Sequence, residues 1–268
     1  MTGTEGRQDL ILHELDGRVG YVTINRPPLN VLNIAAFDRM AAALIDLTER
    51  GGADIVVIRA AGERAFCAGA DVSEHLPEMA PVMLKSFHRV ARLLWTMEAV
   101  SVAAVQGMAL GGGMELALCC DIVVASENSE FGQPEIQVGS FPPIAAALLP
   151  GQVGRQVASD LVLTGRRISG FEALALGLVS RLASPGGFEE ELGSVIASLS
   201  RGSGAVLRQA VKSLRARRSA GFLEDLEANE ALYVNELLPL EDAREGVEAF
   251  LQKRKPRWPS RPKETPER

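Results

Sequence analysis

The sequence predicts an α/β fold built around a mostly parallel β-sheet. Strand and helix patterns alternate through residues 10–135, an order that is typical of parallel α/β proteins. The segments 53–60 and 101–106 are continuous apolar runs, as expected for strands that a parallel sheet buries on both faces. From Gly154 onward the pattern becomes almost entirely helical. We therefore expect a sheet-containing core followed by a helical region.

The N-terminal part is expected to form a hairpin, a helix and a buried strand. Asp16-Gly17 separates two short apolar runs, and this dipeptide favours a hairpin turn. Prolines 27 and 28 end the second run, and Gly51-Gly52 ends the helical pattern. The predicted elements are strands at 10–15 and 19–25, a helix at 34–50 and a strand at 53–60.

The rest of the chain is expected to continue these units and then to become helical. No long linker or internal repeat divides it, so we expect one core at residues 1–200 and a helical C-terminal region with a basic tail at residues 201–268. The predicted elements are a helix at 81–97, a strand at 101–106, a glycine-rich loop at 107–113, a short buried helix at 114–120, a strand at 121–125, a strand-like run at 178–182, a long helical segment at 224–252 and a partly ordered tail at 253–268.

The composition limits the partners and the location of the protein. The chain has 268 residues, a formal net charge of −6 and a pI of about 5.3, so nucleic acid and membranes are not expected partners. Residues 1–10 lack a secretory pattern, and polar residues interrupt the apolar stretch 100–125, which is therefore not a membrane span. Three cysteines and three histidines show no disulfide framework and no metal-ligand spacing. We expect a cytoplasmic protein without a metal site.

Two turns rich in small residues follow buried strands. They are Ala65–Asp71 and Gly107–Glu115, and each precedes a helical pattern, where backbone N–H groups lack partners and the helix dipole adds positive charge. Two such donors would polarise a carbonyl oxygen if they converged. Alternatively, the glycines only let a helix pack close to a sheet. The turns lack the glycine fingerprint of a dinucleotide site and the Gly-Lys-Ser/Thr of a P-loop, which disfavours a Rossmann-type dehydrogenase.

Two glutamates lie in apolar surroundings. Glu115 follows the second turn within a helix that has little polar surface, and Glu135 follows a proline between apolar neighbours. A buried carboxylate is unfavourable unless it is paired or has a chemical role, so catalytic and structural roles both remain open from the residues alone. The side chains expected to have surface or packing roles are His75, His88, Cys67, Cys119 and Cys120.

Five motifs in order resemble the crotonase (enoyl-CoA hydratase/isomerase) superfamily over nearly the whole chain. They are Asn25-Arg26-Pro27, Phe66–Asp71, Gly107–Glu115, Phe131–Glu135 and Phe250–Lys255. The resemblance implies a crotonase-like spiral of ββα units with a helical C-terminal trimerisation region. It also implies assembly as a homotrimer or as a dimer of trimers.

The resemblance further implies roles for individual residues. The amides of Ala70 and Gly112 would form an oxyanion hole for the thioester carbonyl of an acyl-CoA, and the carbonyl groups around Ala68 and Ala70 would recognise its adenine. Coenzyme A is then part of the substrate, and no separate cofactor is expected. The other residues implied to contact the substrate are Pro28, Leu29 and Asp71, together with Phe250 and Lys253 of a neighbouring subunit.

Within this family, two glutamates at the matching positions imply a hydratase. Glu115 would hold and deprotonate the water that attacks Cβ of an enoyl-CoA, and Glu135 would deliver a proton to Cα. The alternatives are an isomerase on the same scaffold, which often keeps only the second glutamate, and a non-catalytic CoA-binding protein.

Two segments depart from the common family pattern. The loop 27–32 is tighter, and the segment 139–145 replaces a glycine-rich turn, so that Phe141, Pro143 and Ile144 are expected to shape the acyl pocket. Both departures resemble the cyclic dienoyl-CoA hydratases of anaerobic aromatic degradation, the cyclohexa-1,5-diene-1-carbonyl-CoA hydratases.

Overall fold

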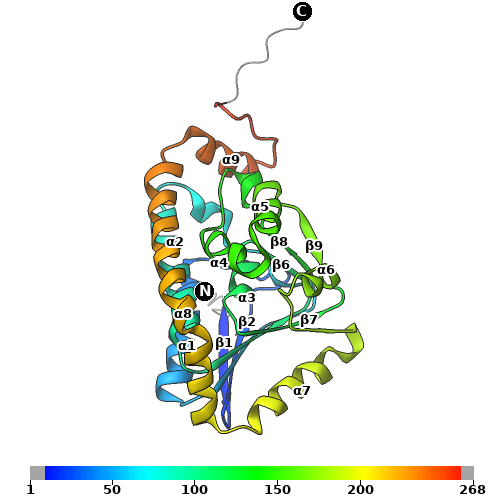
Figure 1. Cartoon of the computed structure of the whole chain (residues 1–268). Coiled ribbons are helices and arrows are strands. Elements are labelled where there is room, and N and C mark those ends of the chain that lie inside the picture. The colour runs from blue at the N-terminus through cyan, green and yellow to red at the C-terminus, as the bar shows by residue number, and fades with distance from the viewer. Residues whose placement is uncertain (1–9, 261–268) are drawn as a thin grey trace, which may run out of the picture.

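The computed structural model describes residues 10–260, apart from the side chains of residues 217–220, and two β-sheets with their covering helices form an α/β fold (Figure 1). The larger sheet has the strand order β1-β2-β3-β5-β7-β10, and its neighbouring strands are parallel except for the β1–β2 hairpin. The mostly parallel sheet predicted from the sequence is thus confirmed. Its strands are β1 (Ile11–Asp16), β2 (Val19–Ile24), β3 (Ile55–Ala60), β5 (Val100–Val105), β7 (Ile122–Ser126) and β10 (Arg181–Ala183).

The smaller sheet consists of three-residue strands. Strands β4, β6 and β8 are parallel neighbours, and β9 pairs antiparallel with β8. Each long strand β3, β5 and β7 is followed by a short strand of this sheet and then by helical structure, which is a spiral of ββα units. The strands are β4 (Ala65–Cys67), β6 (Met108–Leu110), β8 (Glu130–Gly132) and β9 (Arg167–Ser169).

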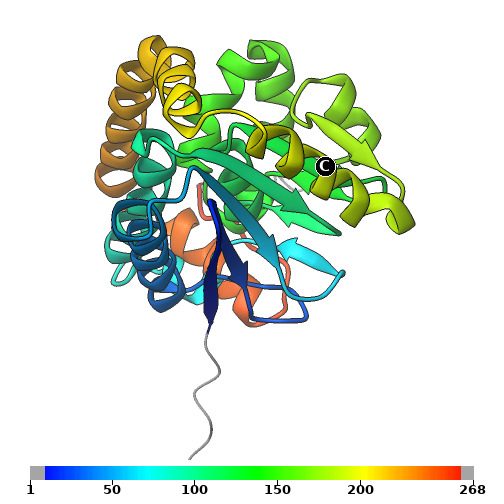
Figure 2. The ribbon, with the colours of Figure 1, turned by 90° about the horizontal axis from the view of Figure 1, so that it is seen from below.

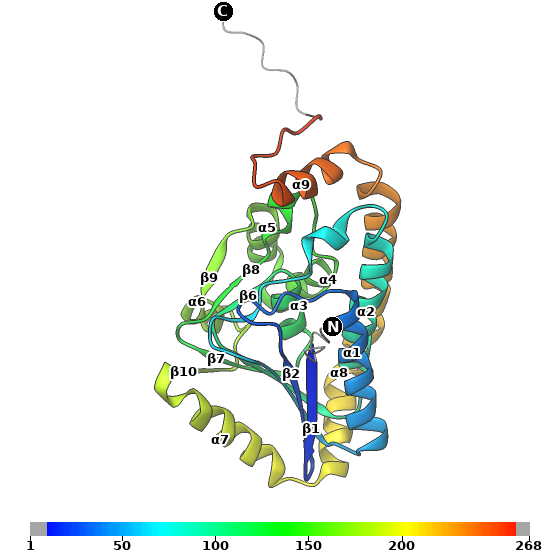
Figure 3. The same cartoon turned by 180° about the vertical axis from the view of Figure 1, so that it is seen from behind.

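Helices cover both faces of the larger sheet (Figures 2 and 3). Alternate residues of β3 point to opposite faces, as strand geometry requires: Val56 and Ile58 join the main core with α1, whereas Ile55 and Val57 pack with Phe188 of α7. The helices are α1 (Ile34–Ile45, extended by a π-helical turn Asp46–Arg50), α2 (Ala80–Thr96), α3 (Gly112–Leu118), α4 (Pro143–Val153), α5 (Arg155–Thr164), α6 (Gly170–Ala175), α7 (Phe188–Ser200), α8 (Gly204–Leu232) and α9 (Glu241–Leu251).

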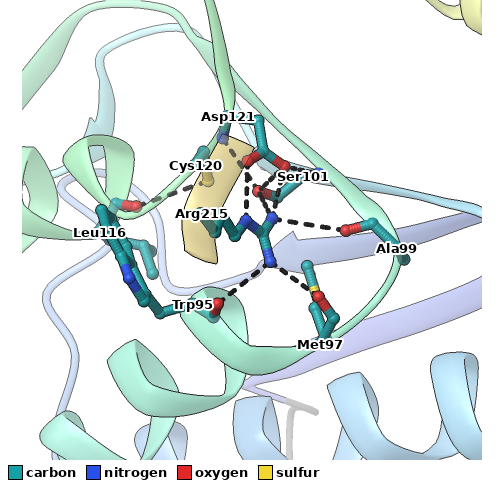
Figure 4. A network of polar contacts seen from close by, with 8 residues as sticks. All are labelled: Trp95, Met97, Ala99, Ser101, Leu116, Cys120, Asp121 and Arg215. Carbon is teal, nitrogen blue, oxygen red and sulfur yellow. Dashed lines mark hydrogen bonds and ion pairs between the residues drawn. The ribbon is translucent and has the colours of Figure 1, made fainter. Parts of the chain in front are cut away.

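A buried arginine holds α8 against the sheet through hydrogen bonds (Figure 4). Arg215 donates to both carboxylate oxygens of Asp121, at 2.9 and 2.5 Å, and to the backbone carbonyl of Met97 at 2.7 Å. Asp121 in turn accepts the backbone N–H of Ser101, the second residue of β5. Because every member of this network has hydrogen-bond partners, the buried charge is compensated and the position of α8 is fixed.

The structure corrects several predicted element boundaries. The helical segment predicted at 224–252 is two helices, because Pro239 interrupts it between the π-helical turn Tyr233–Leu237 and α9. The strand-like run predicted at 178–182 is displaced, since β10 pairs with β7 only from Arg181. Strand β9 lies in a region predicted to be almost entirely helical, and β4 and β6 lie within predicted turns. Strands of three residues are too short to show a periodic pattern.

The predictions for the two chain ends are only partly covered by the structure. Residues 1–9 and 261–268 lie outside the described range. The prediction about a secretory signal concerns the first of these segments, and the end of the predicted tail falls in the second. Residues 253–260 contain no helix or strand. Within the described range, no helix combines the length and apolar character that crossing a membrane requires.

Candidate active site

A cavity of about 410 Å³ lies where three parallel strands of the smaller sheet end. Because β4, β6 and β8 are parallel neighbours, the segments that follow them meet at one edge of the sheet. These segments are 68–70, 111–112 and 134–135, and all of them line the cavity. The apolar side chains that complete its wall come from α2 and from the segment before α4: Met83, Leu84, Phe87, Val138, Phe141, Pro142 and Pro143.

Two backbone amides at the cavity are free to bind a ligand. Gly112 is the first residue of α3, and Ala70 follows the turn after β4. Among the described residues, neither amide donates to a protein acceptor. The two sites are adjacent, because a Cβ built on Gly112 would lie 3.4 Å from the Ala70 nitrogen. A carbonyl oxygen placed between them would therefore meet two N–H donors and the positive end of a helix.

The three consecutive glycines have different roles. Gly111 has a φ of 52° and a ψ of −126°, and a side chain there would collide with the carboxylate of Glu135. A side chain at Gly113 would collide with the backbone carbonyl of Cys67. The close-packing interpretation of the glycine run thus applies to Gly113, whereas Gly111 and Gly112 leave space at the cavity.

Glu115 is a buried carboxylate with backbone donors. It lies one turn into α3, is only 3% exposed, and its Oε1 accepts the Ala145 N–H at 2.9 Å. Burial raises the pKa of Glu115 to about 7, and the N–H groups of Ala145 and Ile144 at the start of α4 oppose that rise. The same backbone contacts hold the Glu115 side chain in place and lower its pKa. A structural role and a chemical role of Glu115 are therefore compatible.

Glu135 faces the same cavity without donors from α4, and only its own backbone N–H lowers its pKa. It lies in a 3₁₀ turn, Pro134–Val138, and no described residue makes a hydrogen bond to its buried Oε2. Burial and then the charge of Glu115 raise the pKa of Glu135 well above its ordinary value. Because two backbone N–H groups of α4 act on the Glu115 carboxylate, whereas the Glu135 carboxylate has only its own backbone N–H and the charge of Glu115 beside it, we expect the pair to hold one proton near neutral pH, on Glu135. Such a pair can act as a base and an acid in one reaction.

Other titratable groups near the cavity are poorly suited to nucleophilic chemistry. Burial raises the pKa of the Cys67 thiol to about 12, so the thiolate is absent at neutral pH. His88 is buried, with its Nδ1 2.7 Å from a carboxylate oxygen of Glu230. His75 lines the cavity, and burial lowers its pKa. Within residues 10–260, no group of three or more His, Cys, Asp or Glu side chains is placed to hold a metal ion.

Several residues predicted from the sequence to contact the substrate do not line the cavity. Pro28 and Leu29 line a separate depression beside Leu10, although the Leu29 carbonyl accepts the N–H of Ala68 at 2.9 Å. The side chain of Ile144 is fully buried in the main core and, unlike Phe141 and Pro143, does not line the cavity. Asp71 caps a short 3₁₀ helix, and Lys253 is exposed.

Phe250 reaches the cavity of its own chain. The break at Pro239 directs α9 back over the turn that carries Glu135. A contact of Phe250 with the coenzyme A bound to a neighbouring subunit stays a prediction. The approach is close, since a side chain at Gly246 of α9 would collide with the carbonyl of Val138. Helix α9 is thus a wall of the cavity.

Several residues of the cavity wall come from distant helices or strands and were not predicted, among them Phe87, Tyr233, Arg167 and Arg254. Phe87 and Tyr233 lie within helical patterns, and no local signal distinguishes them from ordinary core residues. Arg167 of β9 and Arg254 after α9 add positive charge to the wall. Their arrangement depends on tertiary packing, which spacing along the chain does not encode.

The family model for enoyl-CoA hydratase/isomerase matches residues 14–261 of this chain. The chain belongs to that family. A cyclohexa-1,5-dienecarbonyl-CoA hydratase from Thauera aromatica is 36% identical over 254 residues, which cover 92% of this chain and 95% of that protein. A short-chain-enoyl-CoA hydratase from Clostridium acetobutylicum is 34% identical over 254 residues, which cover 91% and 95%.

The fold of this enoyl-CoA hydratase/isomerase family member agrees with solved structures. The crystal structure of an enoyl-CoA hydratase from Mycobacterium avium subsp. paratuberculosis K-10 matches with a TM-score of 0.84 and 32% identity, covering 93% of this chain and 98% of that chain. An enoyl-CoA hydratase/isomerase from Pseudoalteromonas atlantica T6c matches with a TM-score of 0.82 and 29% identity, covering 93% and 99%. The crotonase-like fold and the family predicted from the sequence are thereby confirmed.

The raised pKa of Glu115 predicts a pH-dependent effect of Glu115→Gln on stability. A carboxyl group whose folded-state pKa is raised stabilises the fold below its unfolded pKa, and this stabilisation is lost as pH rises toward about 7. Glutamine does not titrate, so the melting temperature of the variant relative to wild type should rise between pH 5 and pH 8. Thermal unfolding measures this, with the exposed Glu190→Gln as control. A difference that is independent of pH would contradict the burial-driven shift.

The backbone at Gly111 predicts an unequal effect of two alanine substitutions. Gly111 and Gly177 both have positive φ, 52° and 79°, but nothing lies within 4 Å of a Cβ at Gly177. Gly111→Ala should lower the free energy of unfolding by about 1–3 kcal/mol more than Gly177→Ala, because it also displaces the Glu135 carboxylate. Urea unfolding compares them, and equal losses would show that displacing the Glu135 carboxylate carries no cost in stability.

Proposed function

We propose that this chain hydrates the conjugated double bond of an enoyl-CoA thioester. The observation that carries the proposal is the pair of buried carboxyl groups with unequal environments, Glu115 and Glu135, at one cavity with two free amides. Family membership and the named hydratases among its relatives support the reaction class. The substrate provides its own coenzyme A, and no further cofactor is part of the proposal.

The amides of Ala70 and Gly112 would stabilise the charge that develops during the reaction. The thioester oxygen accepts a hydrogen bond from each of the two N–H groups. These bonds make it easier for the oxygen to take up the electron pair released from the double bond. The enolate that forms is favoured by the two donors and by the N-terminus of α3. In comparable enzymes, loss of one such donor slows the reaction by about 10²–10³.

The two carboxyl groups would exchange the protons. Ionised Glu115 takes a proton from water while the water oxygen forms a bond to Cβ and the double-bond electrons move to the thioester oxygen. Protonated Glu135 then gives its proton to Cα as the enolate collapses, so that one H and one OH are added in total. The order of the two pKa values supports this assignment, because Glu115 has the amide donors that favour its ionised form.

The alternative functions make less use of the site. An isomerase needs one carboxyl group to move a proton between carbons, which leaves buried Glu115 without a role in the reaction. A protein that only binds CoA has no use for two buried carboxyl groups beside the acyl cavity, where each is unfavourable. The positions of both glutamates therefore favour hydration over isomerisation or simple binding.

We further propose that the acyl group is compact and cyclic, as in a cyclohexadienoyl-CoA. Phe141, Pro142 and Pro143 close the wall of the cavity, and the Phe141 ring lies 5.3 Å from the ring of Tyr233. A wall of rigid rings favours a flat ring over a flexible chain, which would have to bend. The Thauera aromatica relative, named as a cyclohexa-1,5-dienecarbonyl-CoA hydratase, supports this choice.

We also infer the location, the CoA contacts and the assembly of the protein. Its acidic net charge of −6 supports a cytoplasmic protein that does not bind nucleic acid. The carbonyls around Ala68 and Ala70 would accept hydrogen bonds from the adenine, and Phe250 of the same chain would cover the CoA. Exposed apolar side chains such as Leu163 and Phe171 support a homotrimer or dimer of trimers.

Glu115→Gln and Glu135→Gln should each fold and bind acyl-CoA but hydrate it about 10²–10⁴ times more slowly. The amide keeps the shape of the side chain and removes its proton chemistry. The measurement is the loss of enoyl-thioester absorbance, with calorimetric binding of a saturated acyl-CoA as the folding control and Glu190→Gln as the matched variant. Near wild-type hydration by either cavity variant would remove that residue from the mechanism.

The acyl proposal predicts the substrate preference. The kcat/KM for cyclohexa-1,5-diene-1-carbonyl-CoA should exceed that for crotonyl-CoA, and Phe141→Leu should lower this ratio because it removes one ring of the wall. Steady-state kinetics with both esters measures the ratio. A higher kcat/KM for the linear ester in wild type would restrict the proposal to a general enoyl-CoA hydratase.

A further inference from the structure

Tyr233 is a polar residue in the otherwise apolar part of the cavity wall, beside Phe141. It begins the π-helical turn after α8, is 2% exposed and lines the cavity. Its ring packs against Phe141, at 5.3 Å between centroids. The Arg215 network fastens α8 to the sheet, so the helix that leads into this turn is held in place. Tyr233 is thus a fixed part of the wall proposed to surround the acyl group.

The hydroxyl of Tyr233 has one protein partner and spare hydrogen-bonding capacity. Its oxygen lies 2.8 Å from the Ser140 hydroxyl, and either oxygen could be the donor. A phenol hydroxyl can donate one hydrogen bond and accept another. Among the backbone groups and side chains that the structure describes, only Ser140 fills one of these positions. A second position on the phenol oxygen is therefore available to a ligand.

The same hydroxyl lies in the field of the two glutamates. Burial first, and then the charges of Glu135 and Glu115, raise the pKa of Tyr233 to about 12. The phenol therefore stays protonated at neutral pH and remains both a donor and an acceptor. Ser140 also links Tyr233 to Glu135, because its backbone N–H donates to the Glu135 carbonyl at 3.0 Å.

We propose that the Tyr233 hydroxyl binds the oxygen that hydration adds to the acyl group. Before the reaction this oxygen belongs to the water, and afterwards it is the hydroxyl of the hydroxyacyl-CoA. Glu115 accepts one hydrogen of the water, and Tyr233 holds the oxygen or the second hydrogen without taking up a proton. The inference rests on the proposed hydratase function and adds a third polar group to the two carboxyl groups.

A purely structural role for Tyr233 predicts a different pattern of binding. If Tyr233 only positioned the turn of Glu135 through Ser140, its hydroxyl would affect all acyl-CoA ligands alike. If it contacts the added oxygen, its removal affects only ligands that carry this oxygen. Two ligands that differ by one hydroxyl group, 3-hydroxybutyryl-CoA and butyryl-CoA, separate these two roles.

The test is calorimetric binding of both ligands to wild type and Tyr233→Phe, which keeps the ring against Phe141. We expect the Kd for racemic 3-hydroxybutyryl-CoA to rise about tenfold, the size of one neutral hydrogen bond, and that for butyryl-CoA to stay constant. Tyr21→Phe is the matched control, because Tyr21 is the other tyrosine of the chain and lies on β2 against Arg59. Its two Kd values should equal those of wild type.

Equal weakening of both ligands in Tyr233→Phe, or no weakening of either, would overturn the inference. Hydration of an enoyl-CoA by wild type is measured separately and tests the proposed function alone. A wild type that binds both ligands without turnover would contradict the hydratase proposal, while the selective loss in Tyr233→Phe would still identify a hydroxyl-binding residue. The two failures are therefore distinguishable.

Discussion

The parallel pairing of β4, β6 and β8 holds the candidate active site together. In register, Met108 lies between Ala65 and Glu130, so three short strands end at one edge of the smaller sheet. Segments more than twenty residues apart along the chain, 68–70, 111–112 and 134–135, thereby meet at one cavity. The pairing of β6 with β8 continues beyond the strands, because the Gly111 N–H donates to the Gly132 carbonyl at 2.8 Å. This hydrogen bond lies close in sequence to Gly112 and Glu135. A slip by one residue would turn side chains to the opposite face and separate the two amides.

The environment of the cavity gives its two carboxyl groups different acidities. Both are buried, which favours their protonated forms, but only Glu115 receives N–H groups from the start of α4. Like charges close together also resist simultaneous ionisation. A base and an acid can therefore coexist at one pH without a metal ion being needed for that purpose. Helix α9 closes over this pair from the same chain and limits its contact with water.

Local patterns in the sequence predicted those parts of the fold and site that depend on local structure. The long strands, α1, α2 and the two turns of small residues follow from periodicity, and the family resemblance assigned roles to Ala70, Gly112 and the glutamates. The short strands of the smaller sheet were missed because three residues show no period. Tyr233 and Phe87 were missed because α2 and the turn after α8 reach the cavity only through tertiary packing. Ile144 was misplaced because the sequence does not show which way the first turn of α4 faces.

Turnover in H₂¹⁸O is the most direct test of the central claim that this cavity adds water to an enoyl thioester. Wild-type protein would be incubated with a panel of linear enoyl-CoA and cyclic dienoyl-CoA esters, and the products analysed by mass spectrometry. We predict a product heavier than its substrate by one molecule of ¹⁸O-labelled water for at least one ester, with the label in the acyl group. A product of unchanged mass would indicate an isomerase, and binding of every ester without turnover would indicate a CoA-binding protein; either result would contradict hydration.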